Sequence, residues 1–160
     1  MKTLVTLNSK GGVGKSNITR HLAVAAELES PGSVVLCDTD PQSSLADWWN
    51  ARLSETPPLA VVGVAEFADK QPLLASRFHF LFFDTAAADA KQYTEILQSA
   101  DLIIIPVVPS PDDIRSLNRL TLPVVKKSGR PFIFVMSKAR PGTQLLFSTM
   151  GALSEHGTVC

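Results

Sequence analysis

A glycine-rich stretch near the N-terminus decides the fold of this chain: Asn8-Ser9-Lys10-Gly11-Gly12-Val13-Gly14-Lys15-Ser16-Asn17. The β-branched and apolar run Thr3–Leu7 precedes it, and Ser16–Glu29, with apolar residues at helical spacing, follows it. Between a strand and a helix, such a loop turns its backbone N–H groups inward on phosphate oxygens. The stretch is therefore predicted to bind the phosphates of a nucleotide.

The residue types of the loop suit this chemistry. Glycines lack a Cβ and allow the backbone to approach a ligand closely, and the N-terminus of the following helix adds a partial positive charge. Lys15 supplies a full positive charge, and the hydroxyl of Ser16 can bind a magnesium ion.

Short β-branched or aromatic runs recur along the chain and predict strands. They are Thr3–Leu7, Ser33–Cys37, Leu59–Val62, Phe80–Phe83, Leu102–Val107 and Phe132–Met136. Helices are predicted between and after them, at Ser16–Glu29, Gln42–Leu53, Ala65–Ala75, Lys91–Ser99, Pro111–Lys127 and Thr143–His156. The nearly continuous apolar character of the strands is typical of parallel strands covered on both faces. We predict an α/β fold in one domain, residues 1–160, with a doubly wound, mostly parallel sheet and helices on both faces.

Two positions modify this layout. Pro123 predicts a kink or an early end in the helix Pro111–Lys127. The last residues, Gly157–Cys160, resemble the beginning of another strand. From this we expect a C-terminal truncation that removes the final strand and helices of the fold.

The composition indicates a soluble globular protein. Apolar residues make up 45% of the chain and charged residues 19%, with a formal net charge of zero. No apolar run reaches the roughly 18 residues of a membrane span, so a cytoplasmic location is predicted. Cys37 and Cys160 are too few for a disulfide framework and are interpreted as structural.

The charge is unevenly distributed, because residues 115–140 contain seven basic residues and no acidic one. They are Arg115, Arg119, Lys126, Lys127, Arg130, Lys138 and Arg140. Such a stretch is either a surface for a polyanion or an ordinary solvated face.

Asn8 to Ser16 departs from the ordinary phosphate-loop pattern, which has a glycine where this chain has Ser9. It resembles instead the variant loop of the ParA/MinD family, in which a second lysine, here Lys10, lies near the start. The resemblance implies that Lys10 reaches across a dimer interface to the partner's nucleotide.

Two further segments resemble the switch regions of that family. Asp38-Thr39-Asp40-Pro41-Gln42 follows the second predicted strand, and Phe82-Phe83-Asp84-Thr85 ends the fourth. The resemblance implies that Asp38 organises the magnesium shell, that Asp40 positions the attacking water, and that Asp84 holds magnesium through water. A weaker match runs from Ala100 to Pro111.

The resemblance thus implies a complete set of site residues. The catalytic residues are Lys10, Lys15 and Asp40; the nucleotide-binding residues are Lys10, Gly11, Gly12, Val13, Gly14, Lys15, Ser16 and Asn17; the magnesium site consists of Ser16, Asp38 and Asp84. The implied cofactors are ATP or ADP and Mg²⁺. Phosphoryl transfer depends mainly on positioning and charge neutralisation, for which lysines, a metal and a water-orienting carboxylate suffice.

Two departures from the family bear on function. Ala86-Ala87-Ala88 follow Asp84-Thr85, where relatives carry a proline or glycine. Ser137-Lys138 occupy the place of a base-reading asparagine, so the preference for ATP rests on the family alone.

Several functions share this scaffold. The first expectation is a ParA-like ATPase with slow, partner-stimulated hydrolysis, an ATP-dependent homodimer, non-specific DNA binding and association with the nucleoid. A MinD-like membrane-cycling regulator needs an amphipathic C-terminal helix. A metal-cluster carrier needs paired thiolates, against which the lone Cys37 speaks. A nucleotide-binding module without turnover is the remaining alternative.

Overall fold

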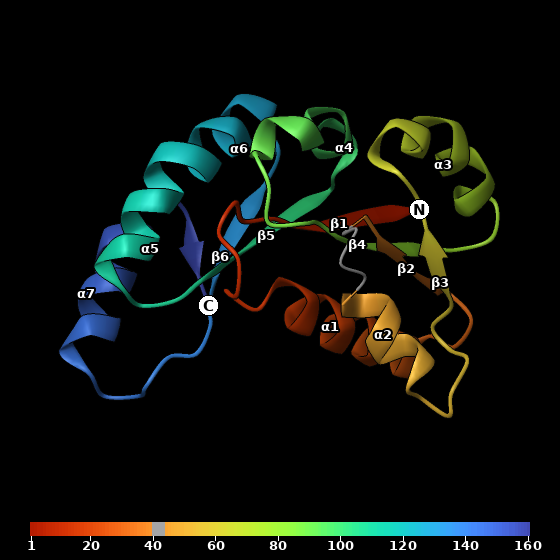
Figure 1. The fold of residues 1–160 in the computed structure, drawn as a ribbon, viewed down its shortest axis with the longest axis horizontal. Helices are drawn as coiled ribbons and strands as arrows, with labels where there is room; N and C mark the ends of the chain where they lie inside the picture. Colours follow the sequence, from red (N-terminus) through yellow and green to blue (C-terminus); the bar gives the residue numbers. More distant parts are fainter. Residues whose placement is uncertain (40–43) are drawn as a thin grey trace.

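Strands and helices alternate along residues 1–39 and 44–160, which the computed structural model describes (Figure 1). The strands are β1 (Lys2–Thr6), β2 (Val34–Asp38), β3 (Leu59–Val61), β4 (Phe80–Asp84), β5 (Leu102–Val107), β6 (Phe132–Met136) and β7 (Thr158–Val159). The α-helices are α1 (Lys15–Glu29), α2 (Ser44–Asn50), α3 (Phe67–Ala75), α4 (Thr94–Ser99), α5 (Pro111–Ser116), α6 (Leu122–Ser128) and α7 (Gln144–Ser154). The 3₁₀ turns η1 (Val64–Glu66) and η2 (Ala90–Tyr93) precede α3 and α4, and the π-helical segment η3 (Leu117–Thr121) joins α5 to α6.

The described strands form one parallel sheet in the order β3-β2-β4-β1-β5-β6-β7. On one side of β1 lie β4, β2 and β3, and on the other side lie β5, β6 and β7. The carboxyl end of β1 is therefore at the switch point of the sheet. In open α/β sheets this crevice is where ligands bind. The predicted α/β class and doubly wound parallel sheet are confirmed.

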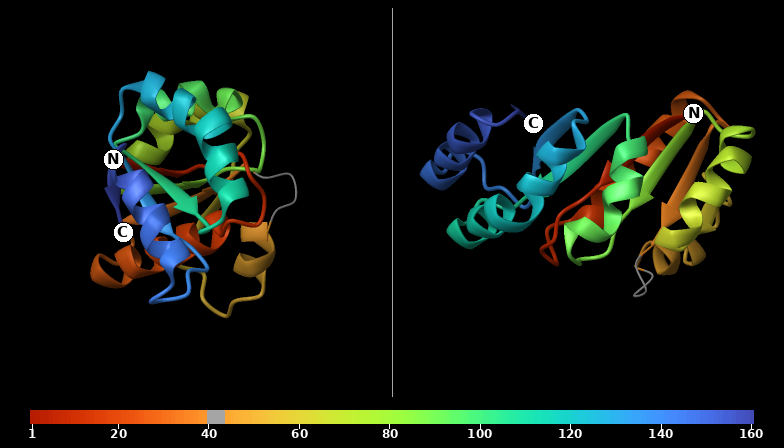
Figure 2. Two further views of the ribbon diagram at one scale, coloured as in Figure 1. Left: turned by 90° about the vertical axis from the view of Figure 1, so that its left-hand side faces the viewer. Right: turned by 90° about the horizontal axis from the view of Figure 1, so that it is seen from above.

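Helices cover both faces of the sheet (Figures 1 and 2). On one side lie α1 and α2; on the other lie α3, α4, α5 and α6, while α7 lies beside β7. Successive residues of β2 point to opposite faces of the sheet. Val34 and Leu36 pack with Ala23 of α1, whereas Val35 and Cys37 belong to the larger hydrophobic cluster on the other face. This two-sided burial explains why the central strands are continuously apolar.

The predicted helix Pro111–Lys127 is three consecutive segments: α5, η3 and α6. The wide π-helical turns of η3 end at Thr121, directly before the turn that contains Pro123. Proline has no N–H to donate to the carbonyl four residues earlier, so the regular hydrogen-bond ladder is interrupted there. The irregularity that Pro123 predicts is therefore present, and the chain continues as a helix beyond it.

Other element boundaries differ modestly from the predictions. Of the predicted helix Gln42–Leu53, the described part is α2, which ends at Asn50; residues 42 and 43 lie outside the described residues. The region predicted as Lys91–Ser99 begins with a 3₁₀ turn in which the Asp89 carboxylate accepts the backbone N–H of Lys91. The strand predicted from Gly157–Cys160 is confirmed as β7, which pairs with β6. None of the described helices has the length and apolar character that crossing a bilayer requires.

Candidate nucleotide-binding site

The residues predicted to bind nucleotide and metal converge at the carboxyl edge of the sheet. Because all strands are parallel, the loops after β1, β2 and β4 emerge at the same edge. Asp84 is in register with Thr6 on β1 and with Asp38 on β2. The fold thus brings together the phosphate loop and two of the three predicted acidic residues; Asp40 lies outside the described residues.

The conformation of the phosphate loop requires glycine at two positions. Gly12 has φ 74° and Gly14 has φ 95°, in the left-handed region that side chains with a Cβ rarely adopt. A Cβ on Gly14 would also lie 2.7 Å from the hydroxyl oxygen of Ser137, which follows β6. The loop shape therefore depends both on glycine and on a neighbour far along the chain.

Asn8 and Thr121 anchor the start of the loop. Asn8, which is buried, donates from its Nδ2 to the carbonyl of Pro106 at 2.8 Å and accepts the backbone N–H of Lys10 at 2.9 Å. The backbone N–H of Ser9 donates to the Thr121 hydroxyl at 3.1 Å. These bonds tie the loop to β5 and to η3. Neither anchor was among the predicted site residues, and Thr121 carries no local signal because it is 112 residues from its partner.

A cavity of about 470 Å³ opens over the loop. Its lining consists of Gly11, Gly12, Gly14, Lys15, Ser16, Asn17, Ser44, Ala87 and Lys138. Lys15 is buried, and its ammonium donates to the carbonyl of Lys10 at 3.2 Å. Val13 is 1% exposed, so its side chain belongs to the core and only its backbone is available to a ligand. Six of the eight predicted nucleotide-binding residues thus line one cavity.

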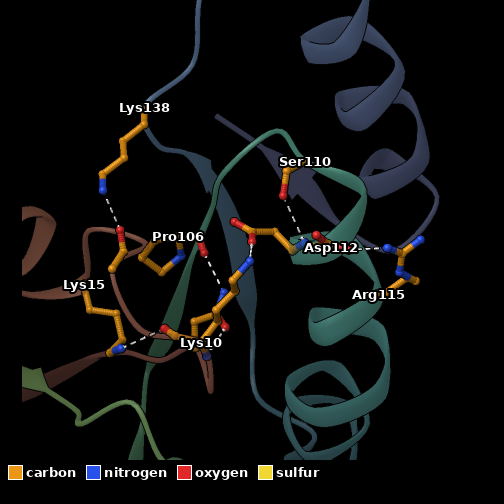
Figure 3. Close-up of polar contacts among 10 residues, drawn as sticks. Lys10, Lys15, Pro106, Ser110, Asp112, Arg115 and Lys138 are labelled. Carbon is orange, nitrogen blue, oxygen red and sulfur yellow. Dashed lines mark hydrogen bonds and ion pairs between the residues drawn. The ribbon is translucent and has the colours of Figure 1, made fainter.

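Lys10 departs from this group, because its ammonium forms an ion pair with Asp113. Asp113 is only 5% exposed and lies in the first turn of α5, where its N–H donates to the hydroxyl of Ser110 at 3.1 Å. Figure 3 shows Lys10 extended toward this helix and Lys15 beside the loop. In the isolated chain the two loop lysines therefore have different partners.

Asp84 has the environment of a cation ligand. Its pKa is raised to about 7, chiefly by burial and also by the nearby Asp38, against the opposing effects of the Ser16 hydroxyl and Lys15. One carboxylate oxygen lies 3.4 Å from the hydroxyl of Thr19. The other, Oδ2, is buried without a hydrogen-bond partner among the described residues. A buried, unpaired carboxylate oxygen beside Ser16 fits a hydrated magnesium ion, which prefers oxygen ligands.

Asp38 lies opposite Asp84 on the neighbouring strand. It is 2% exposed, and its carboxylate accepts the backbone N–H of Ala46 in α2 at 3.3 Å. Two carboxylates side by side in a buried setting repel each other, and a divalent cation relieves that repulsion. The arrangement of Asp38 and Asp84 is therefore suited to a divalent cation.

Lys138 contributes a cation to the cavity from the opposite half of the sheet. Its ammonium donates to the carbonyl of Gly12 at 2.7 Å, across 126 residues of sequence. The sequence marks position 138 as a departure from a base-reading motif and as part of the basic stretch. Neither signal predicts that its side chain lines this cavity.

The basic stretch as a whole is divided among several elements. Lys126 and Lys127 lie on α6 and Arg115 on α5, where Arg115 pairs with the exposed Asp112. Lys126 contacts a ring nitrogen of His156 at 3.4 Å. The stretch therefore comprises Lys138, which is exposed and lines the nucleotide cavity, exposed residues of the α5–α6 segment, and Arg140 in the loop after β6.

Comparison with known proteins agrees with the fold. Residues 4–152 match the CobQ/CobB/MinD/ParA nucleotide binding domain. The chain is 29% identical over 147 residues to the maintenance of carboxysome distribution protein A of Gloeobacter kilaueensis, covering 88% of this chain and 64% of that relative. It therefore spans less than two thirds of that relative's length.

Two solved structures have the same fold. A putative plasmid partition protein from Borrelia burgdorferi bound to AMPPNP superposes with a TM-score of 0.75 at 16% identity, covering 99% of this chain and 84% of that one. Cobyrinic acid a,c-diamide synthase from Mycobacterium smegmatis, with a bound ATP analogue and magnesium, gives 0.75 at 16% identity, covering 98% and 82%. With the family match over residues 4–152, the chain belongs to the CobQ/CobB/MinD/ParA nucleotide-binding domain family.

Proposed function

We propose that this protein is an ATPase that binds ATP with Mg²⁺ and uses hydrolysis to drive a cycle of dimerisation that positions a cargo. The single observation that carries the proposal is the cavity at the carboxyl edge of the sheet. The glycine loop and Lys15 line this cavity, and Ser16 and Lys15 also interact with the buried Asp84, whose Oδ2 has no hydrogen-bond partner among the described residues. Phosphates and a hydrated cation are the chemistry that such an arrangement serves.

Within this site the residues have distinct roles. The backbone N–H groups of Gly11 to Ser16 and the ammonium of Lys15 bind the phosphates, and the hydroxyl of Ser16 holds magnesium. Asp38 and Asp84 hold the water shell of the ion. When bound, magnesium neutralises charge on the transferred phosphate and its leaving group.

Hydrolysis and dimerisation depend on two residues whose roles are inferred from the family. Asp40 orients the attacking water, and Lys10 contacts the nucleotide of a second copy of the chain. The Lys10–Asp113 ion pair supports the second role indirectly, since it holds the Lys10 ammonium away from the cavity of its own chain.

The cargo is inferred from similarity and charge. Relatives are named for carboxysome distribution and plasmid partition, and we propose a comparable positioning role here, with a partner protein that stimulates hydrolysis. Non-specific DNA on the nucleoid is the proposed track. Exposed Lys126, Lys127 and Arg130 supply phosphate contacts without sequence preference.

Hydrolysis is tested by phosphate release with Mg²⁺ and ATP, comparing wild type with Asp40→Ala and Lys10→Ala. We expect Asp40→Ala to bind ATP and dimerise while releasing phosphate far more slowly. Lys10→Ala should bind ATP but lose ATP-dependent dimerisation, measured by light scattering with a non-hydrolysable analogue. If wild type binds ATP without turnover even with DNA and a candidate partner present, the chain is a binding module and the ATPase proposal is wrong.

The DNA step has its own test. Replacing Lys126, Lys127 and Arg130 with alanine should weaken binding of unrelated DNA sequences about equally in the ATP-bound protein. Each lost phosphate contact should reduce the slope of log affinity against log salt by roughly 0.9. ATP-bound protein without any salt-dependent DNA affinity would contradict the DNA track.

A further inference from the structure

The ammonium of Lys138 lies in the nucleotide cavity although the residue is outside the phosphate loop. Lys138 directly follows Ser137 after β6, and its Nζ is 2.7 Å from the carbonyl oxygen of Gly12. It lines the same cavity as Lys15. Figure 3 shows Lys15 and Lys138 approaching the loop from different directions. A cation from outside the loop thus joins Lys15 at this cavity.

The backbone at Lys138 is held in an unfavourable conformation. Its φ is 53°, the one positive value at a non-glycine residue in the described part of the chain. The left-handed region is unfavourable for a residue with a Cβ. Ser137 fixes the turn, because its N–H donates to the carbonyl of Val107 at 2.8 Å. The strained turn directs the Lys138 side chain back over the loop.

The charge of Lys138 has no carboxylate partner in the described residues. Lys2, Lys10 and Lys70 each form an ion pair with a carboxylate. Lys138 instead contacts the Gly12 carbonyl, which accepts a hydrogen bond but does not neutralise the ammonium. An ammonium held in this way beside the glycine loop is suited to an anionic oxygen.

We propose that Lys138 is a phosphate-contacting residue of the nucleotide site, which it completes from β6. The proposal rests on the proposed nucleotide binding and adds to it one residue, Lys138, and the phosphate oxygens as the atoms that this residue contacts. Lys138 contacts phosphate and not the base, because its ammonium lies on the backbone of the loop that encloses the phosphates. The Gly12 carbonyl holds the ammonium in place while the cavity contains no phosphate.

The test compares binding of ATP and of inorganic tripolyphosphate, both with Mg²⁺, by calorimetry. Lys138→Ala should weaken both ligands by the same factor, about tenfold, since a hydrogen bond to a charged group is lost. Lys138→Arg should retain most of the affinity. Lys91→Ala is the matched control, because it removes an exposed ammonium outside the cavity and should leave both affinities unchanged.

A second variant separates the charge from the backbone. Lys138→Gly removes the ammonium and also relieves the strain at φ 53°, so it should unfold at a higher temperature than Lys138→Ala while losing the same affinity. If Lys138→Gly binds like wild type, the backbone explains the effect and the proposal fails. It also fails if Lys138→Ala binds tripolyphosphate like wild type, whether or not ATP is weakened. Wild type that binds neither ligand overturns the proposed function as well.

Discussion

Lys10 of the phosphate loop is paired with the carboxylate of Asp113, 103 residues along the same chain. The proposed function places Lys10 on the nucleotide of a second subunit. The two contacts draw on the same ammonium, and we expect the ion pair with Asp113 to compete with dimerisation.

Asp113→Asn should consequently favour the ATP-dependent dimer. The amide keeps the shape of the side chain but loses the charge, so the dimer dissociation constant should fall about tenfold, as for a charged hydrogen bond of modest strength. Sedimentation with a non-hydrolysable ATP analogue measures the change. Asp112→Asn is the matched control, since the neighbouring carboxylate is exposed and pairs with Arg115. If Asp113→Asn and Asp112→Asn have equal dimer dissociation constants, the Lys10–Asp113 ion pair does not compete with dimerisation.

Asp84→Asn should stabilise the ligand-free protein and abolish its response to magnesium. Burial raises the pKa of Asp84 to about 7, so at pH 8 an ionised carboxylate is held in the interior with Oδ2 unpaired. Removing that charge should raise the melting temperature by about 3 °C or more, corresponding to roughly 1 kcal/mol.

The same thermal scans, repeated with Mg²⁺ and ATP, complete the test of Asp84. Wild type should gain stability from the ligands, and Asp84→Asn should gain much less. Asp69→Asn, an exposed carboxylate on α3, serves as the control and should respond like wild type. A full magnesium-dependent gain in Asp84→Asn removes Asp84 from the metal site.

Gly14→Ala should abolish nucleotide binding and lower stability. At φ 95° a residue with a Cβ is strained, and the added Cβ would lie 2.7 Å from the hydroxyl oxygen of Ser137. Gly32→Ala provides the comparison, because Gly32 also has a positive φ, 78°, but has no atom within 4 Å of the added Cβ. Both variants should lose about 1–2 kcal/mol of unfolding free energy, because a residue with a Cβ is strained at a positive φ. Normal ATP affinity in Gly14→Ala would show that the loop tolerates a different shape.

The two thiols should differ sharply in reactivity. Cys37 is fully buried on β2, and burial raises its pKa to about 12, whereas Cys160 is exposed. At pH 8 a thiol reagent should therefore titrate one thiol in the native protein and two after denaturation. If both thiols react rapidly in the native protein, the reagent reaches Cys37, and the burial of this residue on β2 is contradicted.

Much of this architecture follows from local sequence patterns. The predicted central strands agree with β1, β2, β4, β5 and β6 to within one residue at each end, because strands buried on both faces leave continuous apolar runs. Asp38 and Asp84 could be placed together because the carboxyl ends of parallel strands meet at one edge.

The contacts that shape the loop could not be predicted in the same way. Asp113, Thr121 and Lys138 reach Lys10, Ser9 and Gly12 from 103, 112 and 126 residues away, so no local pattern connects them. They depend on the pairing of β5 with β1, on the pairing of β6 with β5, and on the path of the segment that follows β5. The sequence contains the loop motif, whereas the fold supplies its partners.

The central claim is that the cavity over residues 11–17 binds ATP with magnesium. Calorimetric titration of wild type and Lys15→Ala with Mg²⁺ and ATP tests it most directly, because the variant removes the buried cation at the loop. The account predicts saturable binding by wild type and no detectable binding by a folded Lys15→Ala, with folding checked by circular dichroism. Equal affinities, or a wild type that binds no nucleotide, would contradict it.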